Sequence, residues 1–143
     1  MTEHILNAAE YRFSLSLSIN VFEKDVKNNC PINVTVTASV KCNDFSGAAD
    51  MDLGVEDIVR FTNDLLAIHD TLKGEAVLKE FFFPERYIAF KGESNGFISV
   101  KGYLRDDMKT GELYFENRFD QTYLKDFANG FAAAYSKYKK KKS

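Results

Sequence analysis

Two stretches of the chain alternate strictly between apolar and polar residues, and no other feature constrains the fold as much. They run from Phe13 to Val21 and from Ile32 to Cys42, with mostly Ser, Thr and Asn at the polar positions. A period of two places successive side chains on opposite faces of a strand, so each stretch predicts a strand with one face on a core and one in water. The Asn28-Asn29 pair between them is typical of a turn, and the two strands should form an antiparallel hairpin.

Two later segments repeat apolar residues at intervals of three and four, the period of a helix. The first covers about residues 55–72, and the acidic residues Glu56 and Asp57 in its first turn favour the positive end of the helix dipole. The second runs from Gln121 to about Tyr138 and follows Asp120, a residue type preferred at the N-cap. Both segments are predicted to be amphipathic helices.

Between these helices the pattern returns to that of strands. Strands are expected at residues 76–83, 87–91, 97–104 and 112–119, with a hairpin turn at Ser94-Asn95-Gly96. Residues 43–54 are rich in Gly, Ala and acidic residues and are interpreted as irregular. The predicted order is β-β-α-β-β-β-β-α. This order indicates an α+β fold, an antiparallel β-sheet of about five to six strands with two α-helices packed on one face.

The length of 143 residues predicts one domain, which we place at residues 1–138. Five of the last seven residues are lysines, and residues 139–143 are expected to be a lysine-rich disordered tail; the alternative is a contact with nucleic acid or anionic lipid. The first ten residues lack the features of a signal peptide, and no apolar run is long enough to span a membrane. We therefore expect a cytoplasmic protein that does not bind membranes.

Residue types that carry catalysis or bind metals are few and scattered. Cys30 and Cys42 form no CxxC motif and are expected to be structural thiols. His4 lies in a start that we expect to be frayed, and His69 on the first helix has no second metal ligand at helical spacing. The glycines match no phosphate-binding loop. We therefore expect no enzyme activity, no metal site and no cofactor.

The formal net charge of −2 hides an uneven distribution. Between Asn43 and Glu75, eight acidic residues face only Arg60 and Lys73. Such an acidic face can steer a basic partner toward it, and it can equally be a solvated face that keeps the protein soluble. The candidate residues for binding a protein partner are Asp44, Asp50, Asp52, Asp57 and Asp64. For Asp52 and Asp57, a role limited to the start of the helix is an equal alternative.

Three segments together resemble a known family. They are LLAIHDTLKGEAVLK from Leu65, YIAFKGESNGFISVKGYL from Tyr87, and ELYFENRFDQTYL from Glu112, and the most specific piece is DQTYL at residues 120–124. Over about residues 11–135 the chain resembles the WapI-type immunity proteins, small bacterial proteins that neutralise contact-delivered polymorphic toxins. The shared residues, such as the N-cap Asp120, look structural, so the resemblance assigns no binding residue.

This resemblance implies a stoichiometric inhibitor that covers a toxin domain and has no active site of its own. The acidic body is consistent with a basic toxin domain as partner, because nucleases bind phosphates in basic clefts. Two alternatives remain open: a module that binds a peptide or small ligand on the open sheet face, and a structural domain with no toxin partner. Tyr103 and Tyr114 are expected on that open face, but the acidic body and the absence of RNA-binding motifs argue against direct contact with nucleic acid. The oligomeric state stays open.

Overall fold

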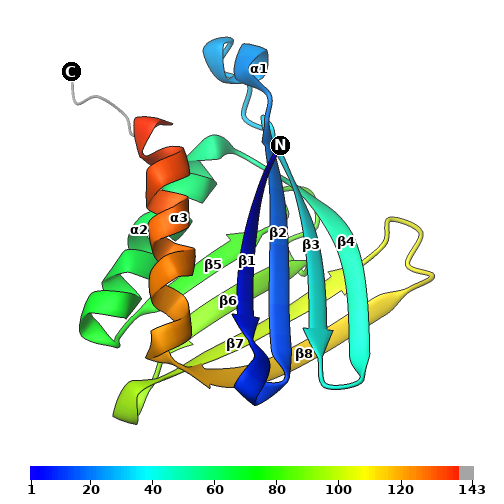
Figure 1. Ribbon diagram of the computed structural model, residues 1–143. Helices are drawn as coiled ribbons and strands as arrows, with labels where there is room; N and C mark the ends of the chain where they lie inside the picture. Colours follow the sequence, from blue (N-terminus) through cyan, green and yellow to red (C-terminus); the bar gives the residue numbers. More distant parts are fainter. Residues whose placement is uncertain (139–143) are drawn as a thin grey trace.

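The computed structural model describes residues 1–138 and contains two four-stranded antiparallel sheets (Figure 1). The predicted lysine-rich tail at residues 139–143 lies outside the described residues. The N-terminal sheet holds the strands β1 (Thr2–Ala8), β2 (Phe13–Val21), β3 (Val34–Cys42) and β4 (Phe45–Leu53), in that order. The C-terminal sheet holds β5 (Glu75–Lys79), β6 (Tyr87–Gly92), β7 (Phe97–Arg105) and β8 (Glu112–Asp120). The helices are α1 (Glu23–Lys27), α2 (Val55–Thr71) and α3 (Leu124–Tyr135).

The α+β class and the antiparallel pairing are confirmed, whereas the single sheet and the predicted strand order are wrong. Each sheet is a meander in which every strand pairs with the next strand in sequence. The long helix α2 separates the two meanders along the chain, so the strands before and after it form separate sheets. The short helix α1 occupies the connection between β2 and β3, where we had expected only a turn.

The two strands missing from the prediction are the edges of the N-terminal sheet. β1 was expected to be frayed, but its inward positions His4, Leu6 and Ala8 are buried, and only leucine among them is strongly apolar. β4 was expected to be irregular because of its small residues. In the structure these residues permit a close approach between the sheets: a Cβ atom at Gly47 would lie only 3.1 Å from a methyl carbon of Leu113 on β8.

The inner faces of both sheets and the apolar stripes of α2 and α3 form one core. Helices α2 and α3 lie side by side, and they pack against β5 and β1 respectively (Figure 1). At the junction between the sheets, the ring of Phe13 on β2 stacks on Phe115 and Phe119 of β8, with centroid separations of 6.2 and 6.1 Å. The apolar residues that recur at helical spacing in these two segments lie in this core: Ile58, Leu65, Ile68, Phe127 and Phe131.

The ends of the helices agree with the sequence in part. The Asp120 carboxylate accepts the Thr122 N–H at 3.0 Å, as expected for an N-cap, and opens a 3-10 turn that leads into α3.

At the turn between β6 and β7, Asn95 and Gly96 both have positive φ, as predicted. The strand predicted at residues 76–83 ends earlier, at Lys79, and residues 80–86 form a loop. We call this connection between β5 and β6 the aromatic loop.

Candidate partner-binding surface

The five candidate aspartates do not form one patch. Asp44 lies in the turn between β3 and β4, at the opposite end of β4 from Asp52. Asp50 and Asp52 alternate along β4, on the face turned away from the core. Asp57 and Asp64 lie on α2, in its first turn and nearly two turns further on. The structure therefore brings together Asp50 and Asp52 and separates Asp44 from the rest.

The hydrogen-bond partners of these aspartates show which of the carboxylates have a structural role. On the outer face, Asp50 and Asp52 accept hydrogen bonds from the Thr37 and Thr35 hydroxyls of β3, at 2.7 and 3.1 Å. Asp57 accepts the Gly54 N–H at 3.1 Å as part of a capping box. It therefore stabilises the start of α2, which is one of the two roles considered for it in the sequence analysis.

The aromatic loop was missed from the sequence, and it is the most unusual surface feature of the described chain. It carries three consecutive phenylalanines, Phe81, Phe82 and Phe83, whose exposed fractions are 53%, 59% and 42%. The rings of Phe81 and Phe82 meet edge to face, with centroids 5.4 Å apart. Large apolar side chains that remain exposed in a cluster mark a binding surface more often than scattered single ones do.

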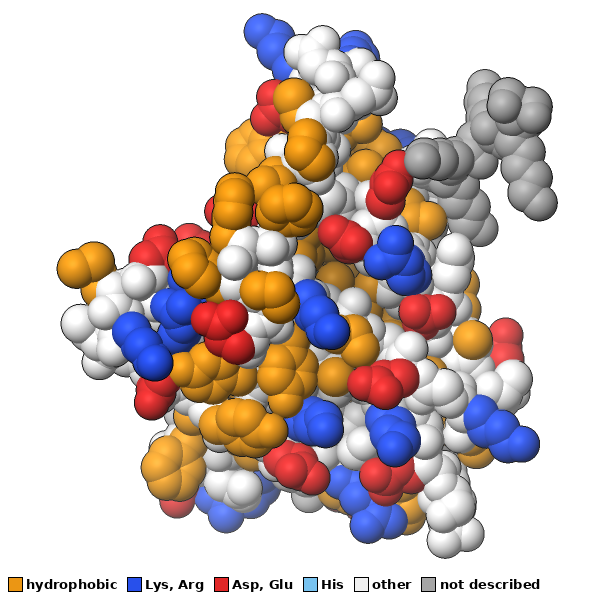
Figure 2. Space-filling view, turned by 180° about the vertical axis from the view of Figure 1, so that it is seen from behind, with side chains coloured by type: hydrophobic (Ala, Val, Ile, Leu, Met, Phe, Trp, Pro, Cys, Tyr) orange, Lys and Arg blue, Asp and Glu red, His pale blue; other side chains and the backbone are white. Residues whose placement is uncertain are grey.

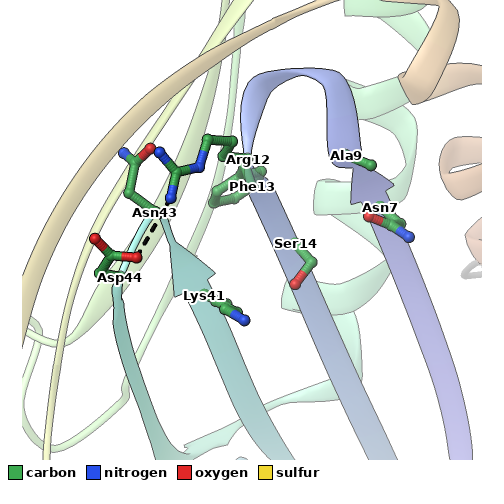
Figure 3. Close-up of a pocket in the computed structure, with 8 residues that line it drawn as sticks. All are labelled: Asn7, Ala9, Arg12, Phe13, Ser14, Lys41, Asn43 and Asp44. Carbon is green, nitrogen blue, oxygen red and sulfur yellow. Dashed lines mark hydrogen bonds and ion pairs between the residues drawn. The ribbon is translucent and has the colours of Figure 1, made fainter.

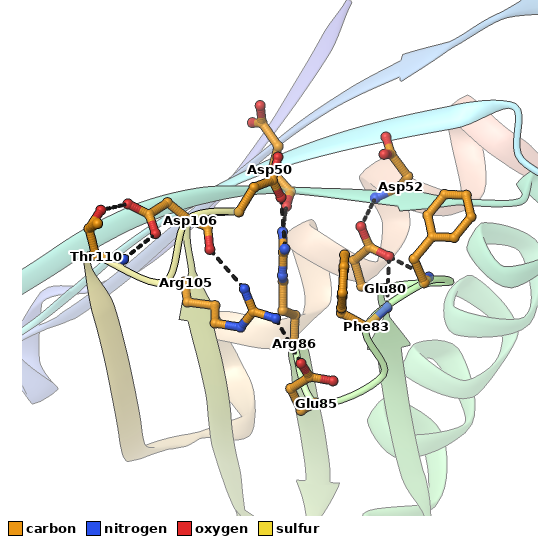
Figure 4. Close-up of polar contacts among 11 residues, drawn as sticks. Asp50, Asp52, Glu80, Phe83, Glu85, Arg86, Arg105, Asp106 and Thr110 are labelled. Carbon is orange, nitrogen blue, oxygen red and sulfur yellow. Dashed lines mark hydrogen bonds and ion pairs between the residues drawn. The ribbon is translucent and has the colours of Figure 1, made fainter.

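A buried carboxylate holds this loop against the edge of β4 (Figure 4). The Glu80 side chain accepts the N–H groups of Phe82 at 2.6 Å, Phe83 at 3.2 Å and Asp52 at 3.3 Å. A backbone bond runs in the same region, from the Phe81 N–H to the Asp52 carbonyl at 2.9 Å. The loop thereby bridges the two sheets. The bridging contacts are with β4, the strand that also carries Asp50 and Asp52.

Two buried arginines support the other side of the loop. The guanidinium groups of Arg86 and Arg105 lie 4.7 and 5.0 Å from the centre of the Phe83 ring, within range of cation–π attraction. Arg86 donates to the Asp107 carboxylate at 2.7 Å and to the Asp50 carbonyl at 3.4 Å.

Arg105 donates to Glu85 at 2.9 Å, and this hydrogen bond lowers the pKa of the Glu85 carboxyl. Phe83 is therefore a support of the loop, whereas Phe81 and Phe82 project from it.

The outer face of the C-terminal sheet adjoins this loop and is hollowed into a shallow groove of about 700 Å³. Tyr87, Tyr103 and Tyr114 line the groove, which confirms the predicted position of the last two on an open sheet face. A hydrogen bond with the Tyr114 hydroxyl raises the pKa of Tyr87 to about 12, so the Tyr87 hydroxyl stays neutral at physiological pH. Hydrophobic side chains gather on this side of the molecule among charged ones (Figure 2).

A smaller hollow of about 380 Å³ lies at the hairpin ends of the N-terminal sheet (Figure 3). Its charged groups are Lys41 and the exposed pair formed by Arg12 and Asp44, whose nearest atoms are 3.3 Å apart. An exposed ion pair of this kind contributes little to stability. The lining residues of this hollow include the Ser14 hydroxyl but no histidine and no cysteine, and we assign no function to it.

The histidines and cysteines of the chain have mainly structural surroundings. His4 was expected in a frayed start and is instead buried, with its Nε2 atom 2.7 Å from the Tyr135 hydroxyl and its ring stacked on Phe131. Within residues 1–138, no three His, Cys, Asp or Glu residues are grouped so that they could hold a metal ion. Cys30 and Cys42 are free thiols. No helix among the described residues is long and apolar enough to cross a membrane.

Comparison with known families shows what kind of protein carries these surfaces. The family model of WapI-like immunity proteins matches residues 5–139, nearly the whole chain. The chain belongs to the WapI-like immunity protein family. No curated protein and no solved structure matches it. Membership indicates toxin neutralisation in general, and the surface that this immunity protein uses has to be argued from its own residues.

Proposed function

We propose that this WapI-like immunity protein binds a toxin domain and neutralises it by covering it, without catalysis. Family membership supports toxin neutralisation, and the described residues contain no grouped metal ligands. The cytoplasm, where an incoming toxin would act, is the expected place of binding. The observation that carries the proposed binding mode is the pair Asp50 and Asp52 on the outer face of β4. Asp50 is exposed and Asp52 is partly buried, and the Thr37 and Thr35 hydroxyls hold their carboxylates in fixed positions.

The proposed contact is made by acidic side chains of β4 and α2 with a basic toxin domain. Toxins that bind nucleic acid present Lys and Arg side chains to phosphates, and carboxylates can compete for the same groups. The proposed contact residues are Asp50, Asp52, Asp57 and Asp64, whereas Asp44 lies at the opposite end of β4 and is not part of this contact. Of these, Asp57 caps α2 and pairs with Arg60, and Asp52 holds the aromatic loop through its backbone. Asp50 and Asp64 are therefore the best positions to change.

The experiment begins with a pull-down from cells that carry this gene and its neighbouring genes, which identifies the toxin domain. Expression of that domain in a bacterial host should stop growth, and co-expression of the immunity protein should restore it. With purified proteins, Asp50→Lys combined with Asp64→Lys should slow association by about 10-fold or more at low salt and much less at high salt. The matched control reverses two exposed acids outside this surface, Glu3→Lys and Asp126→Lys, which changes the net charge equally.

Growth arrest that the immunity protein does not relieve would refute the proposed function. The acidic surface is supported only if the Asp50→Lys, Asp64→Lys protein associates more slowly at low salt than the control protein does. If both associate equally fast at low salt, the net charge and not this surface steers binding.

A second candidate function is a binding module that holds a peptide or small ligand on the open sheet face. The groove of about 700 Å³ lined by Tyr87, Tyr103 and Tyr114 favours it. Tyr114→Ser would weaken the binding of such a ligand and leave the rate of toxin association at the acidic surface unchanged. The two functions therefore separate in one set of variants.

A further inference from the structure

Phe81 and Phe82 are exposed, and neither ring belongs to the hydrophobic core. All large inward positions of β5 and β6, such as Leu78, Ile88 and Phe90, are already buried, and the two rings lie outside that core. Removing apolar surface from water is favourable roughly in proportion to the area buried. The fold leaves that contribution unused at two neighbouring positions, where a partner can supply the missing burial.

The loop is held in place before any partner arrives. The Glu80 carboxylate accepts backbone N–H groups of Phe82 and Phe83, and Arg86 and Arg105 hold the Phe83 ring from beneath. A loop that is already ordered loses little conformational entropy on binding, so more of the contact energy becomes affinity. Rigid aromatic side chains at the centre of an interface are also the residues that most often dominate its binding energy.

The charges around these rings are acidic on two sides. Among the residues labelled in Figure 4, carboxylates outnumber the two arginines, and both arginines are buried and paired with acids. On the other side, Phe81 lines a hollow of about 630 Å³ together with Glu56 and Asp57 from the start of α2. A second copy of this chain would bring the same negative charges face to face, which disfavours self-association through this loop.

We propose that Phe81 and Phe82 are the apolar anchor of the toxin contact and insert into a pocket bordered by Lys and Arg side chains. This inference rests on the proposed function and adds to it the site of tightest contact. In this arrangement the rings exclude water at the centre, and the surrounding aspartates pair with basic groups at the rim. The anchor governs how long the complex lasts, and the aspartates govern how fast it forms.

The test measures association and dissociation rates against the purified toxin domain identified by the pull-down described above. Phe81→Ser combined with Phe82→Ser should speed dissociation by about 30-fold or more while changing association by less than about threefold. Phe45→Ser is the matched control, because Phe45 is 71% exposed and lies at the opposite end of β4. The Asp50→Lys, Asp64→Lys protein should show the reverse pattern, with slower association and less change in dissociation.

The outcomes separate the inference from the function on which it rests. If wild-type protein binds the toxin but the double serine variant dissociates within about threefold of wild type, the anchor is refuted and the proposed function stands. If wild-type protein does not bind the toxin, both fail. A wild-type dimer that the double variant abolishes would assign the loop to self-association and overturn the proposal. Should the double variant not fold, a photo-crosslinking phenylalanine analogue in place of Phe82 must crosslink the toxin and the same analogue in place of Phe45 must not.

Discussion

The two sheets have similar inner faces and very different outer faces. On the outside of β2 and β3, the N-terminal sheet presents short polar side chains, mostly Ser, Thr and Asn. The outside of the C-terminal sheet presents a tyrosine-lined groove, and the aromatic loop projects beside it. Inner faces are apolar in both because both close the same core. The inner pattern therefore indicates the fold, and the difference between the outer faces indicates where a partner binds.

The sharpest way to break this comparison is to remove the contact that makes the inner faces one core. Phe13 of β2 is 2% exposed and stacks on Phe115 and Phe119 of β8. Phe13→Ala should lower the free energy of unfolding by roughly 3–5 kcal/mol, because it leaves a cavity between the sheets. Urea denaturation followed by circular dichroism measures the loss. A single transition would also support the prediction of one domain over residues 1–138, and two separate transitions would contradict it.

The second prediction concerns the connection between the sheets at the aromatic loop. Glu80→Gln replaces a carboxylate that accepts three backbone N–H groups by an amide with one acceptor oxygen. It should lower the free energy of unfolding by about 1–2 kcal/mol and speed hydrogen exchange at the Phe82 and Phe83 amides. The matched control is Glu112→Gln, at an exposed carboxylate that accepts only the Tyr103 hydroxyl among the described residues, and it should change stability by less than about 0.5 kcal/mol. Equal losses in both variants would show that Glu80 does not organise the loop.

Sequence patterns predicted the strands in which alternation is strong and failed at the edges of the N-terminal sheet. β2 and β3 followed from Leu, Ile and Val at every second position, whereas β1 places a histidine and an alanine inward and β4 uses small residues. Whether a small residue belongs to a coil or to a strand under a close neighbour depends on that neighbour. For Gly47 it is Leu113, which lies far away in the sequence. The number of sheets could not be predicted for the same reason.

The candidate site was predictable in its charge and not in its shape. Counting acids between Asn43 and Glu75 singled out the aspartates, but the count cannot show that Asp44 and Asp52 lie at opposite ends of one strand. Residues 80–83 of the aromatic loop were interpreted as the end of the strand predicted at residues 76–83. The chain leaves the sheet there because Glu80 bonds to Asp52, a contact between distant residues that local pattern does not encode.

The third prediction uses pH to test the burial of His4 on the inner face of the N-terminal sheet. Burial lowers the pKa of His4 below its ordinary value of 6.5, so the unfolded chain binds a proton more readily than the folded protein. The free energy of unfolding should therefore be highest above pH 6.5 and decrease as the pH falls below it. In His4→Gln this part of the decrease should disappear, which urea titrations between about pH 7.5 and 5.5 would measure. His69 on α2 is partly exposed, so His69→Gln serves as the control and should keep the pH dependence. A wild-type stability that does not change across this range would contradict the burial of His4.

The smallest expected effect tests whether packing alone joins the two sheets. Cys42 at the end of β3 lies against β8, where its sulfur accepts the Asn117 side-chain amide at 3.2 Å, and it forms no disulfide with Cys30. A reductant or a chelator should therefore leave the melting temperature unchanged, because the described residues form the junction from apolar side chains and hydrogen bonds. Cys42→Ser should also have a small effect, since a hydroxyl can keep the contact with Asn117. Differential scanning fluorimetry in either reagent provides the measurement. A shift of several degrees with the reductant would show that a covalent link contributes to the junction, and a shift with the chelator would show that a metal does. Either result would mean that the matching inner faces of the two sheets are not sufficient to hold them together.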